Sequence, residues 1–185
     1  MSQSTLHSQA VIGLWIEEKN AFTKAVSVIF GVVLLTALAQ IAIPLPFTPV
    51  PITGQTFGVA LLSLLWGRKW GFASVALYVC VGAMGLPVFS AGAAGLKLAT
   101  SGYLLGMCLS AFVIGSLADR GFSKSFKKSF MACLVGSLCV FTCGLIVLSN
   151  FVPKEALLSA GFLPFIPGDI AKSTLASFIA SRASK

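Results

Sequence analysis

Long apolar stretches without a charged side chain constrain this fold more than any other feature of the sequence. No Asp, Glu, Lys or Arg lies between Lys24 and Arg68, and this segment opens with residues 26–43, a run rich in Val, Ile, Leu and Ala. A helix of about 20 mostly apolar residues is long enough to cross the hydrocarbon core of a bilayer. We therefore predict that residues 26–43 span a membrane.

The composition extends this prediction to the whole chain of 185 residues. Hydrophobic residues make up 57% of the sequence and charged residues only 10%, whereas a soluble domain carries about 25% charged residues. This balance excludes a disordered chain, a coiled coil, a secreted disulfide scaffold and a typical cytosolic enzyme. With short loops, a chain of this length has room for roughly five or six spans.

Proline and glycine divide the apolar sequence into six segments. Pro44 ends the first span, because proline lacks an N–H donor and disfavours helix at the residue before it. Five further spans are predicted at residues 55–66, 72–88, 99–117, 130–151 and 168–185, and the long loops between spans are a proline-rich loop at 44–54, a glycine-rich loop at 89–98 and a loop at 152–167.

The positive charges fall almost entirely on one side of this predicted topology. Ten of the 13 lie in the N-terminal tail, the two short loops on that side and the C-terminus, namely Lys19, Lys24, Arg68, Lys69, Arg120, Lys124, Lys127, Lys128, Arg182 and Lys185. Only Lys97 and Lys154 lie in the loops of the other side. Cytosolic loops of membrane proteins are enriched in Lys and Arg. We therefore expect an all-α membrane protein with six transmembrane helices and cytosolic N- and C-termini.

The same charge count bears on domains and partners. Residues 1–22 are expected to form a cytosolic tail with a short interfacial helix, and residues 23–185 a single six-helix transmembrane domain. The net charge of +8 is explained by topology and by contact with anionic membrane lipid, so nucleic acid is not an expected partner.

Asp169 and Lys172 are the strongest indication of a function. They stand three residues apart, on one face of the predicted sixth helix. Charged side chains within a span are costly and usually face a cavity or a partner group. The pair either neutralises itself near the membrane interface or binds a ligand, with Lys172 facing a carboxylate and Asp169 accepting N–H donors.

Further polar residues gather on the same outer side. Candidate ligand-binding residues are Thr53, Gln55, Ser90, Tyr103 and Asn150, with Phe89 as an apolar wall. Apolar walls with a few placed polar groups are typical of small-molecule sites. The span interiors carry no polar stripe, no catalytic set and no metal-ligand cluster, and there is no Walker A motif. We expect a binding protein rather than an enzyme or a channel, with no cofactor and with any ATPase on another chain.

Small residues recur at four-residue spacing on several spans. Gly102 and Gly106 form a GxxxG motif on the fourth span, and the first span begins with two pairs, Ala21/Ala25 and Ser27/Gly31. Small residues let membrane helices approach closely. Such pairs either pack helices within the chain or, on the first span, dock a partner membrane protein.

Four segments resemble the BioY family: residues 43–55 (IPLPFTPVPITGQ), 82–89 (GAMGLPVF), 101–106 (SGYLLG) and 167–172 (PGDIAK). This family comprises the biotin-specific substrate-binding S components of energy-coupling factor (ECF) transporters. The resemblance implies the six-helix S-component fold, and one biotin bound near the outer face with Asp169 and Lys172 as ligand-binding residues. It also implies two kinds of partner, a transmembrane coupling subunit and two cytosolic ATPases.

By the same resemblance, the S component docks through small residues of its first span and topples within the membrane to release biotin inside. The expected location is a prokaryotic cell membrane, which the protein crosses several times. Two alternatives remain at this stage. One is an S component for another vitamin, such as thiamine or riboflavin, and the other is a small membrane enzyme acting on a lipid.

Overall fold

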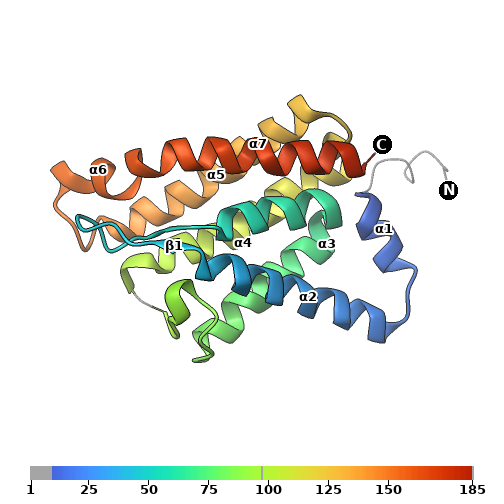
Figure 1. Ribbon diagram of the computed structural model, residues 1–185, viewed down its shortest axis with the longest axis horizontal. Helices are drawn as coiled ribbons and strands as arrows, with labels where there is room; N and C mark the ends of the chain where they lie inside the picture. The colour runs from blue at the N-terminus through green and yellow to red at the C-terminus, as the bar shows by residue number, and fades with distance from the viewer. Residues whose placement is uncertain (1–9, 97, 185) are drawn as a thin grey trace.

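The computed structural model describes residues 10–96 and 98–184. Lys97 of the expected outer loop, residues 1–9 of the expected tail and Lys185 lie outside the described residues. The described chain is a bundle of helices (Figure 1). Its longer elements are α1 (Val11–Glu17), α2 (Ala21–Gln40), α3 (Gln55–Ala83), α4 (Leu98–Asp119), α5 (Phe126–Leu148), α6 (Leu157–Gly161) and α7 (Ile166–Ala183), with a two-stranded ladder of β1 (Ala42–Ile43) and β2 (Ile52–Thr53).

The first predicted span corresponds to α2, although its limits differ from the prediction. The helix begins at Ala21 because Asn20 caps it, with the Asn20 side-chain oxygen accepting the N–H of Thr23 at 2.9 Å. It ends at Gln40 rather than at Ile43. Residues 42 and 43 instead pair antiparallel with 53 and 52, so the proline-rich loop is closed at its base by a short ladder.

The second and third predicted spans are the two halves of α3, which break at Gly67. Gly67 has φ 72° and ψ −172°, and the Asp119 carboxylate accepts the next N–H, that of Arg68, at 3.1 Å. A Cβ on Gly71 would lie 2.9 Å from Cα of Ser63, whereas a straight helix separates residues eight apart by about 12 Å. The chain therefore folds back on itself at Gly67 without an intervening loop.

Glycines allow α4 and α5 to pack closely together. A Cβ on Gly106 would lie 2.7 Å from Cα of Val140, and one on Gly102 would lie 2.7 Å from the Val147 side chain. This confirms that the GxxxG motif of Gly102 and Gly106 packs helices within the chain. The α4–α5 pair then contacts both α3 and α7.

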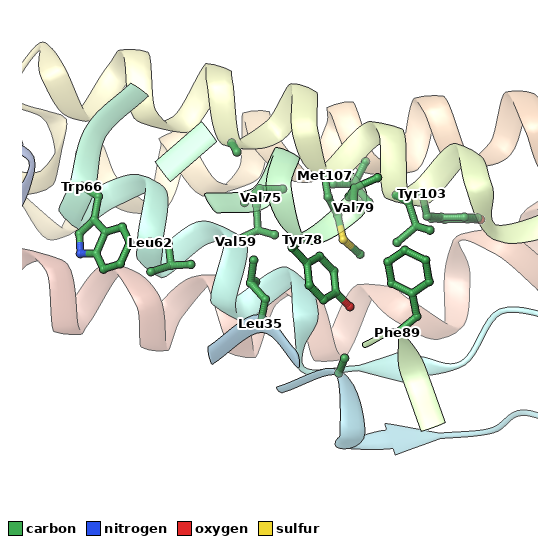
Figure 2. Packing of buried hydrophobic residues seen from close by; sticks show 14 of the residues in the cluster. Leu35, Val59, Leu62, Trp66, Val75, Tyr78, Val79, Phe89, Tyr103 and Met107 are labelled. Carbon is green, nitrogen blue, oxygen red and sulfur yellow. The ribbon is translucent and has the colours of Figure 1, made fainter. Parts of the chain in front are cut away.

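The buried core follows the fold of α3. Leu35 of α2, Val59 and Trp66 of the first half of α3, and Val75 and Tyr78 of its second half form one cluster, which extends to Tyr103 and Met107 of α4 (Figure 2). The predicted loop at 152–167 contains a turn of helix in α6 and two 3-10 turns. The β1–β2 ladder and α6 lie at one end of the molecule, and α1 and the C-terminal end of α7 at the other (Figure 1).

Three of these helices are long and apolar enough to cross a membrane by length and composition: α2, residues Ala99–Asp119 of α4, and α5. The two halves of α3 are short and meet at a basic turn, Arg68 and Lys69. Helix α7 is less apolar because it carries Asp169, Lys172 and Arg182. The helical class of membrane protein predicted from the sequence is confirmed, whereas the number of spans stays a prediction.

Candidate functional site

A cavity of about 320 Å³ lies at the end of the bundle that holds the β1–β2 ladder. Its lining comes from the proline-rich loop and the start of α3, from the glycine-rich loop after α3, from α4 and α5, and from the start of α7. Small-molecule sites have volumes of about 300–1,000 Å³, so the cavity suits one small ligand.

Among the described residues that line this cavity, Asp169 and Lys172 are the two charged ones. They lie one helical turn apart on α7, and Asp169 is buried, with 9% of its surface exposed. The Lys172 ammonium donates to the backbone oxygen of Thr53 and to the hydroxyl of Thr56, both at 2.9 Å. Ser137 of α5 lines a small pocket together with Asp169. Lys172 is therefore held by a backbone oxygen of β2 and a hydroxyl at the start of α3, and both Asp169 and Lys172 line the cavity.

Gln55 stands at the first position of α3 with its side-chain amide held at both ends. The Thr53 hydroxyl donates to Oε1 of Gln55 at 2.9 Å, and Nε2 of Gln55 donates to the hydroxyl of Tyr78 at 2.5 Å. The Tyr78 hydroxyl donates in turn to the backbone oxygen of Val88 at 3.1 Å. In the structure α3 ends at Ala83, so the glycine-rich loop begins earlier than predicted and includes Val88. The chain of hydrogen bonds therefore runs from the proline-rich loop to the glycine-rich loop through a tyrosine that is fully buried.

Aromatic rings form the apolar part of the site. Phe89 is 5% exposed and packs edge-to-face on Tyr78, with ring centroids 5.4 Å apart (Figure 2). The ring fits there because Gly82 has no side chain; a Cβ at that position would overlap the Phe89 ring. Tyr103 of α4, which donates its hydroxyl to the Gly161 oxygen at 2.8 Å, and Phe165 line other walls.

The structure brings together seven of the eight ligand-binding residues expected from the sequence: Thr53, Gln55, Phe89, Ser90, Tyr103, Asp169 and Lys172 all line the cavity. Asn150 does not join them. Its side chain is exposed and its Nδ2 donates to the Ile146 and Val147 oxygens, so it satisfies the end of its own helix α5. The expected set lacked Thr56, which lines the cavity and binds Lys172, and Tyr78, which lies behind it.

The four small residues expected to dock a partner divide into two groups. Ala21 and Ala25 are exposed, whereas Ser27 is half-buried and donates to the Thr23 oxygen within α2. Gly31 is buried, and a Cβ there would lie 2.6 Å from Cβ of Ser74. Gly31 therefore packs α2 on α3 and presents no surface to another protein, which corrects the expectation for this residue.

One side of α2 is left uncovered by residues 10–96 and 98–184. Large apolar side chains stand exposed along it, among them Phe22, Val26, Ile29, Phe30 and Val33. Within residues 10–96 and 98–184, no group of three His, Cys, Asp or Glu side chains is placed to hold a metal ion.

This chain is an apolar helical bundle, and its small cavity is lined by a carboxyl group and an ammonium group. These features are typical of a membrane-embedded binding protein for a small solute. The sequence profile of the BioY family matches residues 9–185. The chain belongs to the BioY family.

Relatives with established names agree with this assignment. The biotin transporter BioY of Thermotoga maritima is 40% identical over 158 residues, covering 82% of this chain and 92% of the relative. A probable biotin transporter BioY of Pyrococcus horikoshii is 37% identical over 163 residues, covering 86% and 95%. The crystal structure of the S-component for biotin from an ECF-type ABC transporter matches with a TM-score of 0.77 and 28% identity, covering 89% of this chain and 94% of that one. These relatives are transport proteins and not enzymes.

Proposed function

We propose that this chain is the biotin-binding S component of an ECF-type importer, which captures biotin in the cavity between the two loops and α7. The observation that carries the proposal is the placement of Asp169 and Lys172 together on the wall of an otherwise largely apolar cavity. Biotin carries a carboxylate, an apolar ring-and-chain body and a ureido group that both donates and accepts hydrogen bonds. The cavity offers a complementary group for each.

In this proposal, Lys172 binds the carboxylate or the ureido oxygen. At the ureido group, the Asp169 carboxylate accepts N–H donors and the Gln55 amide donates or accepts. Phe89 and Tyr103 contact the apolar body. Thr53 and Ser90 supply further hydrogen-bonding groups at the loop edges. The support is that all seven residues line one cavity although they come from the proline-rich loop, the glycine-rich loop and three helices.

The proposal includes a topology of six spans with both termini cytosolic, in a prokaryotic cell membrane. The spans would be α2, the two halves of α3, α4, α5 and α7, within a transmembrane domain of residues 23–185 that follows a tail of residues 1–22. The support is the charge count, ten Lys and Arg against two. The placement of α1 and the C-terminal end of α7 at the same end of the molecule agrees with it (Figure 1).

The partners in this proposal are a transmembrane coupling subunit and, through it, two cytosolic ATPases that supply the energy. The exposed side of α2 around Ala21 and Ala25 is the proposed docking face, since it is apolar, small at these positions and uncovered. After docking, toppling of the S component would turn the cavity toward the cytosol and release biotin.

Mass spectrometry of small molecules that remain bound to the purified protein tests the function most directly. We expect biotin in a ratio of one per chain. Titration with biotin, thiamine and riboflavin then separates this proposal from an S component for another vitamin. Thiamine or riboflavin as the retained ligand, or turnover of a lipid by the isolated chain, would contradict it.

A further inference from the structure

A single buried hydroxyl connects the two loops that line the cavity. Tyr78 lies on the second half of α3, is 0% exposed, and forms no part of the cavity wall. Its hydroxyl accepts a hydrogen bond from Gln55 and donates one to Val88. These two partners, Gln55 and Val88, lie 33 residues apart in the sequence. Figure 2 shows the tyrosine between the core and Phe89.

We propose that Tyr78 is a positioning residue for ligand binding. Its hydroxyl fixes the position of the Gln55 amide relative to the glycine-rich loop. The inference rests on the proposed binding of biotin in this cavity. It adds a residue that never touches the ligand and that acts through two residues that line or border the site.

The orientation of the Gln55 amide depends on this hydroxyl. An amide side chain has two N–H donors and an oxygen with two lone pairs. Thr53 occupies one lone pair and Tyr78 one N–H. If the amide turned over, the Tyr78 hydroxyl would have to donate to the Gln55 oxygen and would lose its bond to the Val88 oxygen, so the network favours one orientation. Its second N–H and second lone pair thereby keep one direction, and Gln55 lines the cavity in which a ligand that donates and accepts would bind.

The glycine-rich loop needs the same support because its backbone is strained. Ala91 has φ 54°, an unfavourable value for a residue with a side chain, which persists only where the surroundings hold it. Tyr78 holds the loop at the Val88 oxygen, and Gln40 holds it at the Phe89 oxygen and at the Gly92 N–H, at 3.3 and 3.0 Å. Of these two residues, only Tyr78 also binds the side chain of Gln55.

The test is the variant Tyr78→Phe, which removes the hydroxyl and keeps the ring on Phe89. The net value of one hydrogen bond corresponds to a factor of roughly 3 to 10 in affinity. We expect biotin to bind more weakly by that factor, mainly through faster dissociation, because the loops no longer hold one position. Ser74→Ala is the matched control: it removes another buried hydroxyl one turn earlier on α3, one that donates only to the Trp70 oxygen, and it should leave biotin binding unchanged.

A double-mutant cycle with Gln55→Ala separates positioning from mere stability. Because Tyr78 acts through Gln55 as well as through the loop, Tyr78→Phe should weaken binding less in the Gln55→Ala background than in the wild type, whatever the melting temperatures. Fully additive losses, or wild-type affinity in Tyr78→Phe, would overturn the inference while the proposed function stands. A wild-type protein that binds no biotin would overturn the proposed function itself and this inference with it.

Discussion

Replacing Lys172 by methionine isolates the ammonium group from the rest of its side chain. The aliphatic part remains and continues to pack, while the contacts of Nζ with the Thr53 oxygen and the Thr56 hydroxyl, each 2.9 Å, are lost. A hydrogen bond to a charged group contributes about 1.5–3 kcal/mol. If the ammonium binds biotin directly, Lys172→Met should weaken binding by roughly 10- to 150-fold, since 1.4 kcal/mol is a factor of ten.

The assay is calorimetric titration of biotin into the purified protein, with thermal unfolding measured alongside. Lys154→Met is the matched control, because Lys154 is exposed in the loop after α5 and lines no part of the cavity. It should bind biotin as the wild type does. Equal affinities for wild type and Lys172→Met would refute the role of the ammonium in binding.

A double variant distinguishes an effect of Lys172 on folding from an effect on biotin binding. Lys172→Met leaves the Asp169 carboxyl group buried without its neighbouring cation, and an unpaired buried charge is destabilising. We therefore expect a lower melting temperature for Lys172→Met and a partial recovery in Asp169→Asn/Lys172→Met, while biotin affinity stays low in both. A double variant that regained affinity together with stability would show that the lysine supports the fold and not the ligand.

Three further predictions address the rest of the molecule. Gly67→Ala should destabilise the protein more than Gly121→Ala, because both glycines have positive φ but only Gly67 also faces a side chain, that of Asp119; thermal unfolding checks this. Ala25→Leu should leave biotin binding intact and reduce assembly with the coupling subunit in co-purification, whereas Gly31→Leu should destabilise the isolated chain through Ser74. The hydrogen bond from Lys69 lowers the pKa of Glu17 below its ordinary 4.5, so the stabilisation of α1 should be complete above pH 4.5 and be lost as the pH falls through the lowered pKa. Fluorescence of Trp70, whose ring N–H also binds Glu17, should report that loss in the wild type and not in Glu17→Gln.

Each of these predictions has a clear contrary result. Equal melting temperatures for the two glycine variants would mean that the chain at Gly67 adapts to a side chain. Full assembly of Ala25→Leu with the coupling subunit would remove this part of α2 from the docking face. An acid transition in Glu17→Gln equal to that of the wild type would assign the transition to another group.

The sequence was informative where one physical constraint dominates. Uninterrupted apolar residues predict α2, α4 and α5, because a helix that crosses the hydrocarbon core must be mostly apolar. A charged side chain in such a helix is costly, and this cost singled out Asp169 and Lys172, which line the cavity. The limits of helices were less predictable. Residues 42 and 43 continue the apolar pattern of the helix but form a strand. Their partners, residues 53 and 52, lie on the far side of the proline-rich loop, so the local pattern could not predict the pairing.

Side-chain partners that depend on the folded path could not be predicted from local pattern. Asn150 has a suitable side chain for a ligand-binding residue and lies on the predicted outer side, yet its amide donates to two oxygens of its own helix. Tyr78 is an isolated aromatic residue in an apolar run, and nothing near it in sequence indicates a role. Its partner Gln55 lies 23 residues earlier, and the two meet only because α3 folds back at Gly67.

That fold-back has a consequence for how the protein tolerates insertions and deletions. Loops between helices usually tolerate inserted or deleted residues, but the two halves of α3 are joined by one glycine, Gly67. Each residue of an α-helix turns the chain by about 100°, so one residue added or removed near position 67 would rotate the second half by that angle. The Tyr78 hydroxyl would then point away from Gln55, and a change near position 67 would alter the ligand cavity at the other end of the molecule.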